Sequence, residues 1–146
     1  MNAREYLWQL KNIDKRIKDK MDEAQRWRDI AENTTSKLSE DKVQTSPKPD
    51  KMADAIVNAV QYERESEEIA KKLTVFKHRV TMMIDRIDDI RHYDALKMFF
   101  VKDMTYVQMQ AQMDKSYRHV RREVDKAVDA FGTMYADEVE KSEKIR

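Results

Sequence analysis

Side chains that can bind phosphate and contact base edges are concentrated between Lys115 and Arg122. This stretch, KSYRHVRR, holds four cationic residues and no acidic one. Extended to Lys126, it counts five basic residues against Glu123 and Asp125, a local charge of +3. A guanidinium group can bind a phosphate, and it can read guanine through two parallel hydrogen bonds. Such chemistry needs a rigid element that presents these side chains on one face.

The residues before this stretch predict a short helix followed by a tight turn. Thr105 can cap the helix, and Gln108 three residues later can complete a capping box. The apolar side of this helix recurs at helical spacing and consists of Tyr106, Met109 and Met113. Asp114 tolerates a left-handed turn, and Ser116 can cap a second helix.

The second helix is predicted to have an apolar stripe and a basic outer face. The stripe consists of Val120, Val124, Ala127, Val128 and Phe131. A short capped helix, a tight turn and a longer basic helix form a helix-turn-helix pattern. On this pattern the candidates for base contacts, near the helix N-terminus, are Tyr117, Arg118 and Arg121. The candidates for phosphate contacts are Lys115, Ser116, His119 and Arg122.

The whole chain predicts an all-α protein, in which a long antiparallel helical hairpin precedes a C-terminal trihelical unit. The hairpin is expected over residues 1–89 and is coiled-coil-like, with helices at 3–32 and from Asp50 to about 88 or 89, and a flexible loop at about 33–50. Glu63 and Ser66 interrupt its second apolar seam, which predicts a polar layer. The helix-turn-helix unit is expected over 90–135, with its first helix at 91–101, and a charged tail over 136–146.

Composition excludes several classes of protein. One glycine, two prolines and no cysteine leave no disulfide scaffold and no cysteine-based zinc site. The stretch from Asp85 to His92 offers acidic and histidine side chains from one helix only, which favours a helix junction with a capping aspartate over a metal site.

No phosphate-binding loop or nucleophile arrangement is present, so we expect neither an enzyme nor a cofactor. No signal peptide or membrane span is predicted, so an intracellular protein without a membrane partner is expected.

Three stretches together resemble a known family: MNAREYLWQLKNIDKRI at the start, DKMADA from Asp50, and KSYRHV from Lys115. The chain is similar to small phage and prophage proteins whose C-terminal domain resembles region four of bacterial sigma factors; ArpU-type late-transcription regulators are related in kind. Two turn residues, Asp103 and Asp114, stand where that family would have glycine, and Gln110 stands where it would have alanine.

The resemblance implies a phage-encoded transcription regulator that binds double-stranded DNA in the cytoplasm of a bacterial host cell. In such a regulator the long hairpin would mediate dimerisation or contact with host RNA polymerase. A phage DNA-packaging recognition subunit, similar to a small terminase, also combines a helix-turn-helix with helical oligomerisation elements and stays open as an alternative. So does a helical interaction protein that binds no DNA and whose basic face is simply solvated.

Overall fold

The chain is all-α, as predicted. The computed structural model describes the backbone of residues 1–40 and 49–145, and the side-chain environment of residues 1–36 and 51–145. It is 83% helical, and the described residues contain no strand. None of the helices found among them combines the length and the apolar character needed to cross a membrane.

The chain divides into two compact units at positions that differ from the expected boundary at residue 89. One, here called the hairpin unit, is Asp14–Leu73. The other, here called the terminal unit because it holds both ends of the chain, combines Met1–Ile13 with Thr74–Arg146. The first residues of the chain and the last turns of the second long helix therefore belong with the C-terminal helices and not with the hairpin.

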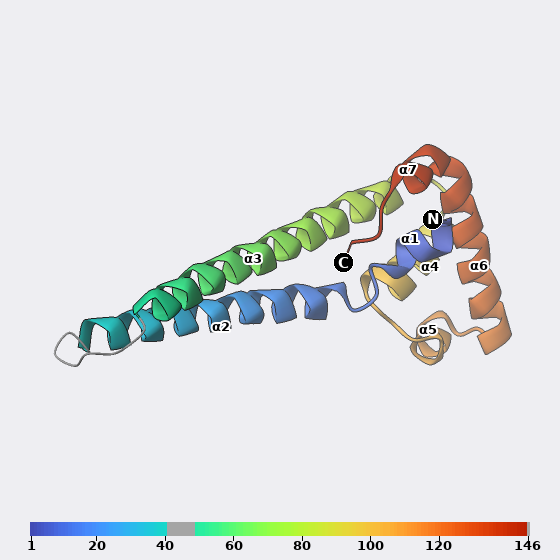
Figure 1. Cartoon of the computed structure of the whole chain (residues 1–146). Coiled ribbons are helices and arrows are strands. Elements are labelled where there is room, and N and C mark those ends of the chain that lie inside the picture. The colour runs from blue at the N-terminus through green and yellow to red at the C-terminus, as the bar shows by residue number, and fades with distance from the viewer. Residues whose placement is uncertain (41–48, 146) are drawn as a thin grey trace. The chain divides into compact units, whose positions relative to one another are not determined.

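The hairpin unit is built from α2 (Ile13–Glu40) and from most of α3 (Pro49–Asp85), which run antiparallel (Figure 1). Among the residues of this unit whose side chains are described, the buried ones are mostly small: Ala24, Ala31, Ala59, Ser66 and Ala70, with Leu73 as the large exception. Small side chains allow two helix backbones to approach closely. Larger rings flank this seam, since the Trp27 and Tyr62 rings lie 4.8 Å apart.

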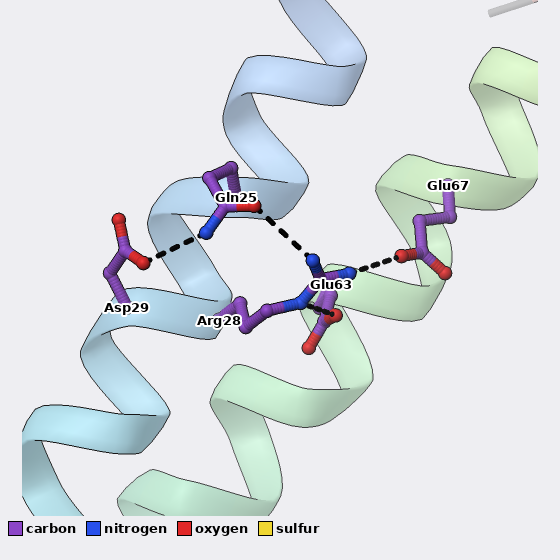
Figure 2. A network of polar contacts seen from close by, with 5 residues as sticks. All are labelled: Gln25, Arg28, Asp29, Glu63 and Glu67. Atoms are coloured by element: carbon purple, nitrogen blue, oxygen red, sulfur yellow. Dashed lines mark hydrogen bonds and ion pairs between the residues drawn. The ribbon is translucent and has the colours of Figure 1, made fainter.

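A polar layer crosses the hairpin unit, as Glu63 predicted (Figure 2). The Arg28 guanidinium donates from Nε to Glu63 Oε1 at 2.8 Å and from Nη2 to Glu67 Oε1 at 3.0 Å. Its Nη1 donates to Gln25, and the Gln25 amide donates in turn to Asp29. The hydrogen bond to Glu63 raises the pKa of Arg28. The Glu63 side chain is only 17% exposed, so its carboxylate needs this cationic partner. The pair therefore favours the register of α2 and α3 that brings Arg28 beside Glu63.

The first predicted helix is in fact two helices. α1 (Ala3–Trp8) is capped by Asn2, and the chain then turns before α2 begins at Ile13. Asn12 closes this turn with a left-handed φ of 58°. α2 runs on to Glu40, so the predicted loop is wrong for residues 33–40, while residues 41–48 of that loop lie outside the described part of the chain. α3 ends at Asp85, three or four residues before the expected end.

The terminal unit packs around α6 (Tyr117–Met134), which contacts α1, α4 (Ile90–Leu96), α5 (Tyr106–Met113) and α7 (Ala136–Lys141) (Figure 1). The largest fully buried side chains come from all parts of this unit and include Tyr6, Leu7, Leu10, Ile84, Leu96, Phe100, Met109 and Phe131. The only glycine of the chain, Gly132, lies where α1 crosses α6, and a Cβ added there would stand 2.9 Å from Ala3 Cβ.

Two left-handed turns of the terminal unit hold each other in place. Asn12 donates its backbone N–H to Asp103 Oδ2 at 3.3 Å, and Asp103 has a φ of 55°. Lys11 Nζ lies 3.3 Å from Asp103 Oδ1, donates to the carbonyl of Met104 and stands 3.6 Å above the Phe99 ring. The Lys11 side chain is only 11% exposed, and this burial lowers its pKa while the hydrogen bond to Asp103 opposes the shift.

The helix predicted at 91–101 is present with a change of winding. α4 is followed by a π-helical turn, η2 (Lys97–Val101). Asp89 caps α4 by accepting a hydrogen bond from the Arg91 N–H at 3.0 Å, which confirms the capping aspartate. Lys97 on η2 pairs with Asp85 at the end of α3 at 2.8 Å. The described residues contain no group of three or more potential ligands that could hold a metal ion.

The charged tail predicted from residue 136 is wrong. Residues 136–141 form α7, and Val139 on it is buried. Tyr135 donates its hydroxyl to the Met83 carbonyl at 2.7 Å, which ties the end of α6 to α3. Farther on, the Ile145 N–H donates to Gln9 Oε1 at 3.1 Å. The C-terminal residues are thus part of the terminal unit.

Candidate nucleic-acid interface

Local capping forms the turn between α5 and α6 as the sequence predicted. Thr105 accepts a hydrogen bond from the Gln108 N–H at 3.1 Å, and Gln108 returns one to the Thr105 N–H at 2.9 Å. Asp114 ends α5 in the left-handed conformation, with φ 54° and ψ 47°. Ser116 then caps α6 by accepting from the His119 N–H at 3.2 Å. These contacts fix where each helix begins and ends, so the exposed face of α6 starts at a defined residue.

The apolar face of α6 is buried and its basic face is exposed, as predicted. All five stripe residues are buried, namely Val120, Val124, Ala127, Val128 and Phe131. All seven candidate contact residues are exposed, namely Lys115, Ser116, Tyr117, Arg118, His119, Arg121 and Arg122. The structure therefore brings the whole predicted set together at the N-terminal half of one helix and its cap.

Two carboxylates of α6 that lie beside the basic residues, Glu123 and Asp125, are already paired. Glu123 lies 3.3 Å from His119 Nε2, one turn along α6. Asp125 lies 2.8 Å from Arg4 Nη1, which comes from α1. Within the described part of the chain, no carboxylate lies within ion-pair distance of the four cations from Lys115 to Arg122. These four charges face solvent without an internal carboxylate partner. An external anion can therefore bind them without first displacing a carboxylate.

Arg4 and Tyr106 are site residues that sequence reasoning missed. Arg4 Nη2 donates to the Tyr106 hydroxyl at 3.3 Å while Nη1 holds Asp125. The hydrogen bond to Asp125 raises the pKa of Arg4, and burial raises the pKa of the Tyr106 hydroxyl. Arg4 precedes Asp125 by 121 positions, so no local pattern could have indicated the pair.

An aromatic series ends at the candidate interface. The Phe99 ring stacks on Tyr106 at 4.7 Å with an interplanar angle of 10°. The Tyr106 and Tyr117 rings in turn form a T-shaped pair, with centroids 5.5 Å apart. Tyr117 is the first residue of α6 and is 44% exposed. Its ring is thus presented to solvent at the start of the basic face and contacts the Tyr106 ring.

Comparison with known proteins adds no relative. No protein-family model, no curated protein and no solved structure matches the chain. The resemblance to phage proteins with a domain like sigma region four therefore stays a prediction.

Proposed function

We propose that this chain is a phage-encoded transcription regulator that docks the N-terminal half of α6 in the major groove of promoter DNA. One observation carries the DNA-binding part of the proposal: four exposed cations without an internal carboxylate partner stand at the start of a capped helix that follows a tight turn. The regulator class comes from the resemblance of the chain's three stretches to phage proteins. Host RNA polymerase remains a proposed partner on the same ground.

Side-chain position divides the proposed roles. Arg118 and Arg121 are exposed and one turn apart on α6, where recognition residues reach base edges, and the Tyr117 ring precedes them. Lys115, Ser116 and Arg122 flank these residues and suit phosphate contacts, to which the N-terminal N–H groups of α6 can add. His119 joins the phosphate set if it exchanges Glu123 for a phosphate oxygen.

The test compares base reading with simple charge attraction. A duplex selected by the wild-type protein from a random-sequence library is titrated beside a scrambled duplex at several salt concentrations. Arg118→Ala and Arg121→Ala should each lose about 1–3 kcal/mol on the selected duplex and reduce the preference for it. Arg122→Ala should weaken both duplexes alike and reduce the salt slope by about one.

Arg64→Ala is the matched control for charge. It removes one exposed arginine from α3 in the hairpin unit, so it should leave both titrations unchanged if the contacts are those of α6. Equal losses on both duplexes for all three α6 variants would reduce the proposal to non-specific attraction. Absence of binding at low salt would favour an interaction protein, and a ring-sized oligomer in light scattering would favour the packaging subunit.

A further inference from the structure

Arg4 joins three helices at the edge of the candidate interface. It belongs to α1, and its two terminal nitrogens bind side chains of two other helices. One partner, Asp125, is on α6 one turn after Arg121, and the other, Tyr106, is the first residue of α5. A single guanidinium thus links both helices of the helix-turn-helix pattern to the start of the chain.

The geometry favours an indirect role for this arginine. A rigid fork that donates to two fixed acceptors restrains both of them, because the planar guanidinium holds its donors at set angles. The charge of Arg4 is matched by Asp125 at 2.8 Å, so it adds little net attraction for phosphate. The contact instead fixes the distance between the middle of α6 and the first turn of α5.

Tyr106 transmits this restraint to the proposed recognition helix. Its ring is stacked on Phe99 and forms a T-shaped pair with Tyr117. Its hydroxyl is held by Arg4. Loss of that hydrogen bond would free the Tyr106 ring to turn, and the exposed Tyr117 ring at the first position of α6 would lose a fixed ring contact.

We propose that Arg4 is a positioning residue for DNA recognition, which sets the angle of α6 against α5 and the placement of the Tyr117 ring without touching DNA itself. This inference rests on the proposed function. Its consequence is that the N-terminal helix α1 contributes to sequence preference, although none of its residues needs to contact a base.

The DNA test uses Arg4→Gln, which keeps a hydrogen-bonding side chain and removes the charge. Preference for the selected over the scrambled duplex should fall by about fivefold, the scale of one partly exposed ion pair. The salt slope should stay at the wild-type value, because no phosphate contact is lost. Arg64→Gln, which removes an arginine charge in the hairpin unit, is the matched control and should leave the preference unchanged.

Rescue and a DNA-free measurement complete the test. The conservative variant Arg4→Lys keeps a cation beside Asp125 and should recover part of the preference. In the absence of DNA, Arg4→Gln should shift the NMR signals of the Tyr106 and Tyr117 rings, whereas Arg64→Gln should not.

The outcomes separate this inference from the proposed function. A salt slope reduced by about one in Arg4→Gln, with equal losses on both duplexes, would make Arg4 a direct phosphate contact and overturn the inference while the function stands. Unchanged Tyr106 and Tyr117 signals, or an unchanged preference, would overturn it as well. A wild-type protein without any duplex preference would refute the proposed function itself, and the positioning role would fall with it.

Discussion

Glycine substitutions at Asp114 and Asp103 should change stability in opposite directions. The two aspartates have almost the same left-handed φ, 54° and 55°. The Asp114 side chain makes no hydrogen bond or ion pair among the described residues, whereas Asp103 pairs with Lys11 and accepts the Asn12 N–H. The same substitution therefore removes only backbone strain at one turn, and strain together with a half-buried ion pair at the other.

The expected magnitudes follow from these contacts. A left-handed conformation costs an ordinary L-residue about 1–2 kcal/mol, and the greater chain entropy of glycine offsets about 0.5–1 kcal/mol of the relief. Asp114→Gly should accordingly raise the free energy of unfolding by about 0.5 kcal/mol. Asp103→Gly gains the same amount but leaves the Lys11 ammonium without its carboxylate, which costs about 1.5–3 kcal/mol. Its net effect should be a loss of about 1–2.5 kcal/mol.

Urea unfolding followed by Trp8 fluorescence measures this difference. Trp8 packs against Phe99 at 5.9 Å in the terminal unit, and a Trp27→Phe background removes the signal of the hairpin unit. Asp103→Asn is the intermediate control, since asparagine also tolerates the left-handed turn but lacks the charge. If Asp103→Gly were as stabilising as Asp114→Gly, the contact between Lys11 and Asp103 would contribute nothing, and the account of these turns would be wrong.

Two further substitutions test the packing of each unit. Gly132→Ala should destabilise the terminal unit by about 1–3 kcal/mol, because the new Cβ would stand 2.9 Å from Ala3 Cβ. Adding Ala3→Gly should restore the lost stability. An unchanged unfolding midpoint of the Trp8 signal would show that α1 does not pack there. Arg28→Ala should lower the unfolding midpoint of the hairpin unit, measured by Trp27 fluorescence, because Glu63 loses its partner. The difference from the wild-type midpoint should shrink in high salt. Equal midpoints would mean that the polar layer does not stabilise the hairpin.

Features that depend on a few neighbouring residues were predictable from the sequence. The caps at Thr105 and Ser116 and the left-handed Asp114 were all predicted, because each involves contacts over three or four positions. The buried stripe of α6 and the exposure of its basic residues were predictable for the same reason, since one helix period separates the two faces. The polar layer at Glu63 was predicted as an interruption of an apolar seam.

Features fixed by distant contacts were not predictable. Leu7, Leu10 and Ile13 keep helical spacing across the break after α1, and no glycine or proline marks it. The turn at Asn12 is held by Asp103, which lies 91 positions later. Arg4 shows the same limit at the candidate interface, because its partners become neighbours only when α1 packs on α6.

The division of the terminal unit has a consequence for the order of folding. Its first piece, residues 1–13, leaves the ribosome long before α6, while the hairpin unit between them, residues 14–73, makes its contacts within one continuous stretch. The hairpin can therefore fold during synthesis, ahead of the unit that surrounds it in sequence. Closing an unstructured loop of that length would cost about 3–4 kcal/mol of chain entropy, from (3/2)RT ln n with n about 60. A hairpin that is already formed replaces most of that unstructured chain, so the late docking of α1 bears less of this cost.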